Sequence, residues 1–218
     1  MHNSAVHPAI LDGLAVLLPV DCAGCGAADR AVCAACLAAI DGPPIESHTP
    51  GGLLVRSAVA YEGIARALIL ALKEHNRTDA ARPLARRLAP LLPSTLPLVA
   101  VSPSPAAWRR RGYDPVRLLV RRPTLRVLRV VRATEVQKSL SVDERAANRA
   151  GFLRATRSLD GLRVVIVDDV VTTGATLDEA VRAIQSAGGE VDHAITLAAT
   201  PLKFERPSRT VWEVSGIP

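Results

Sequence analysis

The chain has few aromatic residues and lacks the two sequence motifs most typical of nucleotide-binding loops. Only 3% of its 218 residues are aromatic, so the core must be built from Val, Leu, Ile and Ala within a hydrophobic content of 49%. Neither Gly-x-x-x-x-Gly-Lys-Ser/Thr nor Gly-x-Gly-x-x-Gly occurs anywhere in the chain. These absences count against the usual nucleoside-triphosphate and dinucleotide sites.

Long hydrophobic runs, internal repeats and low-complexity segments are also missing. Residues 1–20 have no basic start, Asp12 interrupts their apolar residues, and the stretch is too short to span a membrane. We therefore expect a cytoplasmic protein without membrane insertion. The length suits one ordinary domain with a small appendage. The formal charge of +6 suits anionic ligands or nucleic acid and selects neither.

Cysteine is confined to the first 36 residues, where it forms two Cys-x-x-Cys pairs. Two such pairs close together can supply four thiolates to a tetrahedral zinc ion. Two disulfides or a redox pair are the competing interpretations, but clustered cysteines in an intracellular chain favour a metal. Four thiolates leave no open coordination position, so the expected role is structural. The predicted ligands are Cys22, Cys25, Cys33 and Cys36.

Turn-forming residues divide the chain into a small first part and a larger second part. Asp41–Pro44 and Thr49–Gly52 are rich in Gly and Pro and bracket a loop. We therefore predict a four-cysteine zinc-binding module over residues 1–50 and an α/β domain over residues 51–218.

The larger part alternates between apolar strand patterns and helical stripes. This alternation predicts a mostly parallel sheet flanked by helices, with ligands bound at the carboxyl ends of the strands. The expected strands are residues 53–61, 96–101, 127–131, 164–167 and 191–198. The expected helices are residues 64–74, 79–92, 114–121, 142–150 and 177–187.

Residues 163–176 carry the most informative pattern in the chain. An apolar run, Val164–Val167, is typical of a strand buried on both faces, and two carboxylates, Asp168 and Asp169, follow it. Adjacent carboxylates at the end of a strand can accept hydrogen bonds from the 2′- and 3′-hydroxyls of a ribose. The next residues form a turn that leads into a helix, whose first N–H groups favour an anion.

The turn itself has the composition of a phosphate-binding loop. Three threonines offer hydroxyl donors, and Gly174 allows the backbone to curl closely round a phosphate. Together with the two carboxylates, the turn predicts a site for ribose 5-phosphate. The competing interpretation is an ordinary strand, tight turn and capped helix, with Thr176 as the N-cap. The candidate phosphate-binding residues are Val171, Thr172, Thr173, Gly174, Ala175 and Thr176, and this stretch is called the phosphate turn below.

A basic segment follows the expected strand at residues 96–101. In a parallel sheet its start would lie beside the phosphate turn, where Ser102 could hold pyrophosphate oxygens and Arg109, Arg110 and Arg111 could neutralise a polyanion. Nine arginines and one acid lie between residues 109 and 132. A solvated basic surface and a nucleic-acid strip, with Trp108 and Tyr113 stacking bases, are the alternatives.

Several of these segments, taken in order, resemble the ComF family of competence-associated, type I phosphoribosyltransferase-like proteins. Residues 168–176 resemble the motif with which such enzymes bind phosphoribosyl pyrophosphate (PRPP). The resemblance implies a zinc-binding module on a phosphoribosyltransferase fold that takes PRPP with Mg²⁺, and a link to DNA uptake in some members. The residues that carry it are the four cysteines, Trp108–Tyr113, Gln137, Leu140, Arg145, Asn148, Phe152 and Asp168–Thr176.

The sequence departs from related patterns in two ways. The family usually has Asn-Gln where this chain has Asp114-Pro115, and the 6-oxopurine enzymes place an aspartate where Thr172 stands. The second departure argues against hypoxanthine or guanine as acceptor. We expect an enzyme that transfers phosphoribosyl to an unidentified nitrogen acceptor and releases pyrophosphate. A PRPP sensor without catalysis, and a competence protein that binds single-stranded DNA or the competence machinery, remain the alternatives, and an oligomer is compatible with each.

Overall fold

The computed structural model describes residues 20–28, 30–101, 105–131 and 151–201. The predicted helix at residues 142–150 and the candidate site residue Ser102 lie outside these ranges. Among the described residues, none of the helices combines the length and the apolar character needed to cross a membrane.

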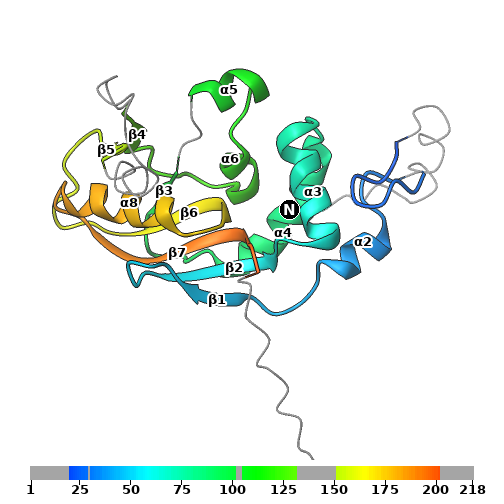
Figure 1. Ribbon diagram of the computed structural model, residues 1–218, viewed down its shortest axis with the longest axis horizontal. Coiled ribbons are helices and arrows are strands. Elements are labelled where there is room, and N and C mark those ends of the chain that lie inside the picture. Colours follow the sequence, from blue (N-terminus) through cyan, green and yellow to red (C-terminus); the bar gives the residue numbers. More distant parts are fainter. Residues whose placement is uncertain (1–19, 29, 102–104, 132–150, 202–218) are drawn as a thin grey trace, which may run out of the picture.

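The centre of the molecule is a five-stranded sheet (Figure 1). The strands of the described residues are β1 (Ile45–His48), β2 (Leu54–Ala60), β3 (Leu98–Ala100), β4 (Leu128–Val130), β5 (Leu153–Ala155), β6 (Arg163–Val171) and β7 (Glu190–Ala199). The order in the sheet is β1-β2-β7-β6-β3, and only β1 is antiparallel to its neighbour. The predicted α/β class with a mostly parallel sheet is therefore confirmed. Strands β4 and β5 form a separate two-stranded sheet.

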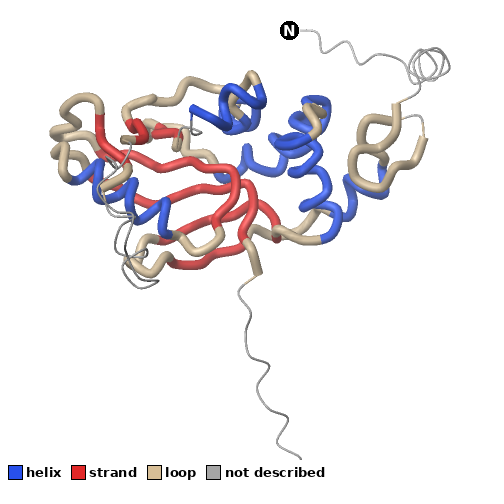
Figure 2. Tube along the Cα trace, turned by 45° about the horizontal axis from the view of Figure 1, so that its top comes forward, coloured by secondary structure: helices blue, strands red, loops and turns tan. Residues whose placement is uncertain are grey.

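Helices cover both faces of this sheet. The α-helices of the described residues are α2 (Ala34–Ala39), α3 (Gly63–Glu74), α4 (Ala81–Leu88), α5 (Pro105–Arg111), α6 (Pro115–Val120) and α8 (Ala175–Gln185). The 3-10 turns η1 (Thr78–Ala80) and η2 (Ala89–Leu91) flank α4, so the predicted helix at residues 79–92 is broken into three pieces. Figures 1 and 2 show α8 along one face of the sheet, α5 and α6 above it, and α2 beyond α3.

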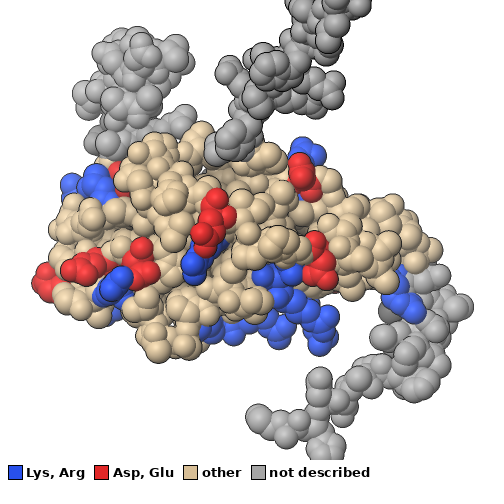
Figure 3. All heavy atoms as spheres, turned by 90° about the horizontal axis from the view of Figure 1, so that it is seen from below, with Lys and Arg blue, Asp and Glu red and all other residues tan. Residues whose placement is uncertain are grey.

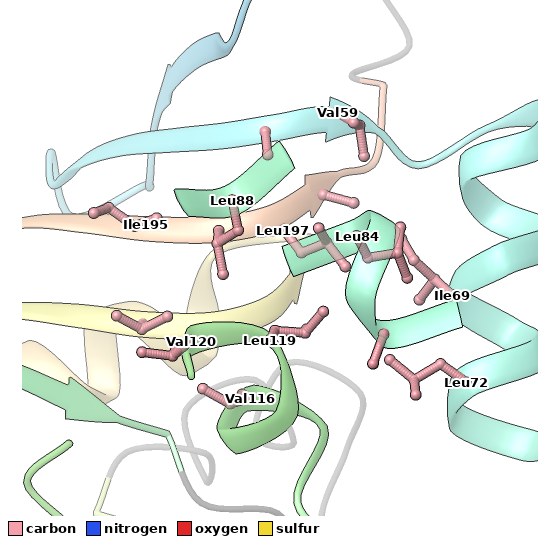
Figure 4. Close-up of a cluster of buried hydrophobic side chains, with 14 of the residues drawn as sticks. Val59, Ile69, Leu72, Leu84, Leu88, Val116, Leu119, Val120, Ile195 and Leu197 are labelled. Carbon is pink, nitrogen blue, oxygen red and sulfur yellow. The ribbon is translucent and has the colours of Figure 1, made fainter. Parts of the chain in front are cut away.

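Strand β6 explains the two hydrophobic clusters, because its successive side chains point to opposite faces. Val165 and Val167 pack with α3, α4 and α6, whereas Val164 and Ile166 pack with α8. All four are fully buried. Figure 4 shows the first cluster, in which leucines and valines of the three helices close over the sheet. Because β6 is covered on both faces, it is apolar throughout this run.

The end of this strand was predicted too early from the sequence. Strand β6 was predicted to end where the acid pair begins, but it continues to Val171, which pairs with Ala199 of β7. The long partner strand keeps the backbone ladder in place beyond the carboxylates. Asp168 and Asp169 therefore lie within the strand, and helix α8 starts at Ala175, two residues before the predicted start.

The structure gives Asp114 and Pro115 a local role. Asp114 is the N-cap of α6, where its Oδ1 accepts the N–H of Val116 at 3.0 Å. Pro115 occupies the first helical position, where its missing N–H costs nothing. The carboxylate is 2% exposed and pairs with Arg126 at 3.1 Å. Asp114 and Pro115 together thus supply a strong helix start.

A buried carboxylate ties β5 to α8. Glu179 accepts the N–H groups of Gly151 (2.8 Å) and Leu153 (3.0 Å), and Arg182 donates to it at 2.7 Å. Arg182 also donates to the Leu153 carbonyl at 2.8 Å. Burial raises the pKa of Glu179, but the Arg182 guanidinium and the two N–H groups outweigh burial and lower it. These hydrogen bonds thus anchor β5 to α8, the helix that follows the phosphate turn.

We predict that Glu179→Gln lowers the free energy of unfolding by about 1–3 kcal/mol, because a charge-assisted pair with Arg182 is lost in a buried site. Urea denaturation at neutral pH measures the difference. Glu190→Gln, at an exposed position on β7, is the matched control and should change little. Equal stability of the two variants would contradict a role for this pair.

Candidate functional site

The carboxyl ends of the parallel strands meet at one edge of the sheet, and the acid pair lies there. The arrowheads of β6 and β7 in Figure 1 point toward α3. Continuing the alternation of β6, Asp168 projects to the side of α8 and Asp169 to the side of α3. The two neighbouring carboxylates therefore have different surroundings.

Asp169 has a cationic partner that the sequence did not reveal. Lys73, in the last turn of α3, places Nζ 2.9 Å from each carboxylate oxygen. The side chains of Lys73 and Asp169 are 21% and 18% exposed, so solvent and small ligands can reach the pair. The candidate site thus carries a built-in positive charge next to the acids.

Asp168 forms no ion pair with any of the residues that the structure describes, although the charge of Lys73 acts on it from a distance. Burial and the negative charge of Asp169 raise the pKa of Asp168 to about 8, and Asp114 adds to the rise. The N–H of Asp169, which donates to Asp168 Oδ1 at 2.7 Å, and the charge of Lys73 act in the opposite direction. A carboxyl group with this pKa is protonated in most molecules at neutral pH and can then donate a hydrogen bond.

The turn after β6 presents its hydroxyl groups outward. Thr172, Thr173 and Thr176 are exposed, whereas Gly174 is buried with a φ of +80°. Gly174 is the N-cap of α8, so Thr176 is not the cap that the alternative interpretation proposed. The first N–H groups of a helix have no partner within it, and they face the position above the turn. The predicted phosphate-binding residues 171–176 run without interruption from the last residue of β6, through the turn at residues 172–174, into the first two residues of α8.

A second segment, far away in the sequence, supports this turn. A Cβ atom at Gly174 would lie 2.9 Å from the Thr49 methyl carbon and 3.1 Å from Pro50 Cδ. Thr49 donates its hydroxyl to Asp178 of α8, and the N–H of Gly51 donates to the same carboxylate at 3.0 Å. The turn between β1 and β2 therefore holds the phosphate turn in position.

Two of the three predicted pyrophosphate-binding arginines have protein partners. Arg110 and Arg111 pair with Glu74 at 3.0 and 3.1 Å. Arg111 is only 10% exposed and also donates from Nε to the Lys73 carbonyl at 2.8 Å. Arg109 is exposed. The basic segment is thus fastened to the end of α3, next to the residue that contacts Asp169.

The four cysteines come together as predicted. Their sulfur atoms all lie within 4.8 Å of one another, and Cys25 Sγ is 3.6 Å from Cys33 Sγ. Tetrahedral thiolates around zinc have sulfur atoms roughly 3.8 Å apart, given a Zn–S bond of about 2.3 Å. The N–H groups of Gly24 and Cys33 point at Cys22 Sγ at 3.4 and 3.3 Å. This donor set fits a metal ion such as zinc.

The electrostatics of the sulfur cluster fit the same interpretation. Burial raises the pKa of Cys22, but N–H groups of Cys33, Cys25 and Gly24 outweigh it and lower the pKa to about 6. Burial and the other three sulfurs raise the pKa of Cys36. A cation in the centre would stabilise four thiolates that otherwise repel one another.

The cysteine cluster packs against the main domain through α3. A Cβ atom on Gly24 would lie 3.2 Å from Ile64 Cγ2, and Ile64 packs on the first hydrophobic cluster. Arg77, just beyond α3, donates to the Asp21 carbonyl at 2.8 Å. The cysteine segment thus contacts α3 in its first turn, at Ile64, and the chain just beyond its last turn, at Arg77.

Sequence reasoning missed Lys73, Thr49 and Asp178. Each acts through a partner about 100 or more positions away, which no local pattern reveals. One signal pointed to Lys73: only three of the 27 basic residues are lysines. In a chain that otherwise uses arginine, a lysine at the end of a helix indicates a place where the two are not interchangeable.

We predict that Asp168→Asn stabilises the protein increasingly as pH rises. The folded-state pKa lies above that of an unfolded aspartate, so the wild type loses stability as pH rises through that interval up to about 8, and the amide does not. Between about pH 5 and pH 8.5 the advantage of the variant should grow by several degrees of melting temperature, at roughly 2–4 °C per kcal/mol. A constant difference across this range would contradict the raised pKa.

We also predict about one zinc ion per chain, bound by the four thiolates. Cys36→Ser should abolish stoichiometric zinc and lower the melting temperature on the order of 10 °C, because metal binding is coupled to folding of the module. Elemental analysis and thermal denaturation measure both effects. Ala35→Ser, on the exposed side of α2, is the matched control and should keep its zinc. Full zinc content in the Cys36 variant would refute the four-thiolate site.

Comparison with known proteins identifies the class of domain around this site. Residues 111–218 match the family model described as "Phosphoribosyl transferase domain". A stretch of 39 residues, 18% of the chain, is 46% identical to orotate phosphoribosyltransferase from Sulfolobus acidocaldarius and covers 20% of it. A stretch of 62 residues, 28% of the chain, is 40% identical to orotate phosphoribosyltransferase from Pyrobaculum calidifontis and covers 32% of it.

The chain thus spans between a fifth and a third of the length of these curated relatives. The matched region of the family model contains the acid pair, the phosphate turn and α8. From residue 111 onward, the chain carries a phosphoribosyltransferase domain with a distant relationship to orotate phosphoribosyltransferases.

Proposed function

We propose that this protein binds PRPP with Mg²⁺ and transfers its phosphoribosyl group to a nitrogen acceptor, as a protein of the ComF type. The observation that carries the proposal is the arrangement at the end of β6: two carboxylates, a hydroxyl-rich turn and the start of α8 in one stretch. The phosphoribosyltransferase-domain match over the same residues supports it.

In the proposed reaction, the bond between C1 of the ribose and the pyrophosphate oxygen breaks. Its electron pair leaves with pyrophosphate, a new C1–N bond forms to the acceptor, and the acceptor nitrogen releases a proton to water. Positive charge develops on the ribose ring as the leaving group departs. Magnesium bound with PRPP supplies charge neutralisation for the departing pyrophosphate.

The residues of the site have distinct roles in this proposal. Asp168 and Asp169 hold the ribose hydroxyls and favour the cationic ring electrostatically. Residues 171–176 hold the 5′-phosphate, so that binding energy from a remote group fixes C1 in place. Ser102 and Arg109 are the proposed pyrophosphate contacts; Arg109 is exposed, and Ser102 lies outside the described residues.

The ComF assignment adds the first part of the chain to this proposal. A four-cysteine cluster that precedes the phosphoribosyltransferase domain, in one chain, is the order that the resemblance implies. We propose that residues 1–50 form the zinc module and residues 51–218 the transferase domain. Strand β1, although it precedes residue 51, pairs with β2 in the main sheet.

Binding of single-stranded nucleic acid is a second candidate function, favoured by the distribution of charge. Residues 109–132 contain nine arginines and one acid. On the face seen from below in Figure 3, which is turned away from α5 and α6, further Lys and Arg side chains gather along one margin. Arg126 lies 5.7 Å from the centre of the Trp108 ring, which is 39% exposed. Salt-dependent binding of an oligonucleotide, lost when these arginines are replaced, would test this surface.

Calorimetry with Mg²⁺-PRPP tests the primary proposal. The wild type should bind PRPP saturably, and Asp168→Asn/Asp169→Asn should weaken binding by about a hundredfold or more, because the ribose hydroxyls lose the charged Asp169 acceptor and the Asp168 carboxyl group together. Glu190→Gln, at the opposite end of β7, is the matched control. Unchanged affinity in the double variant would rule out the acid pair as the ribose site.

A positive result leads to the acceptor. Pyrophosphate release is then measured with a panel of amines and bases, with orotate included because two relatives carry that name. Binding of PRPP without release by any acceptor would favour a PRPP sensor over an enzyme.

A further inference from the structure

Lys73 is the one ammonium group of the described residues that contacts the acid pair, and its geometry leaves it available for a ligand. Nζ lies 2.9 Å from both oxygens of Asp169. An ammonium has three donors, so at least one remains after this pair is made. One fifth of the side chain is exposed, which gives a ligand access.

The end of α3 is held firmly enough to present this group. Arg111 Nε donates to the Lys73 carbonyl at 2.8 Å, and the Tyr113 hydroxyl donates to the Leu72 carbonyl. Arg110 and Arg111 both pair with Glu74, the next residue of the helix. These contacts satisfy carbonyls at a helix end that otherwise lack partners. The basic segment therefore fixes the backbone from which Lys73 extends.

The chemistry of PRPP places its pyrophosphate within reach of this lysine. In ribose, the carbon that carries the pyrophosphate is bonded directly to the carbon that carries the 2′-hydroxyl. A cation that is paired with the carboxylate holding the ribose hydroxyls is therefore adjacent to the leaving group. Two unpaired carboxylates would repel a ligand as negative as PRPP, and the lysine offsets that repulsion.

We propose that Lys73 binds the pyrophosphate group of PRPP while it keeps Asp169 in place, and that Arg111 positions Lys73. This inference rests on the proposed function, because it assigns a ligand group within the same site. It also changes the role of the basic segment: Arg111 does not contact the pyrophosphate itself but holds the end of α3, from which Lys73 extends. A compact ammonium suits the position because it can serve a carboxylate and a phosphate oxygen at once.

The test compares two ligands that differ at C1. Calorimetry measures Kd for Mg²⁺-PRPP and for ribose 5-phosphate, which lacks the pyrophosphate. Lys73→Met should weaken PRPP binding by roughly 10- to 100-fold, as expected for loss of a charge-assisted hydrogen bond, and ribose 5-phosphate binding by much less. Lys73→Arg should recover part of the PRPP affinity because it keeps the charge. Arg66→Met, on the exposed side of α3, is the matched control.

Equal losses for the two ligands would overturn the proposal, because a lysine that merely positions Asp169 affects both alike. Unchanged PRPP affinity in Lys73→Met, with a wild type that binds PRPP, would overturn this inference and leave the proposed function standing. A wild type that binds neither ligand would overturn both. Zinc content and melting temperature of each variant confirm that the fold is intact.

A double-mutant cycle tests the role of Arg111. Arg111→Gln should produce a smaller loss with the same preference for PRPP. In the background of Lys73→Met it should add little, because its effect passes through the lysine. Losses that multiply would overturn the positioning role and make Arg111 an independent contact.

Discussion

The parallel pairing of β6 with its two neighbours is the constraint on which the remaining structure depends. With β3 on one side and β7 on the other, β6 is covered by helices on both faces, and its polar residues lie outside the buried run, with Arg163 before it and the acid pair after it. The same pairing brings the carboxyl ends of the parallel strands to one edge. Ligand-binding groups from distant parts of the sequence therefore meet there.

Two adjacent aspartates acquire different chemical states from this one arrangement. Alternation along the strand sends Asp169 to the side of α3, where Lys73 compensates its charge, and sends Asp168 to the other side, where burial raises its pKa. The net charge of the pair is thus much smaller than two carboxylates imply. A site of this kind can accept a polyanion while it still offers acceptors and a donor to sugar hydroxyls.

The sequence revealed the features that are encoded locally. The sheet type, the four-cysteine cluster and the composition of the phosphate turn follow from apolar periodicity, Cys spacing and Gly174. Contacts between distant segments could not be predicted from the sequence, because local patterns do not report them. The pairing of Lys73 with Asp169, for example, spans 96 positions. Strand β1 was missed because Ile45–His48 has only one large apolar residue, and β6 was cut short because carboxylates are uncommon inside buried strands.

The close fit between Gly174 and Thr49 means that the phosphate turn cannot keep its shape when it is transferred to another protein by itself. Its shape is specified jointly by residues 171–176 and by the turn between β1 and β2, more than a hundred positions earlier. A graft of the motif alone onto another parallel sheet would lack the hydroxyl that engages Asp178. Substitutions in the turn between β1 and β2 are correspondingly restricted. Its small and hydroxyl-bearing residues should change only together with residues at the start of α8.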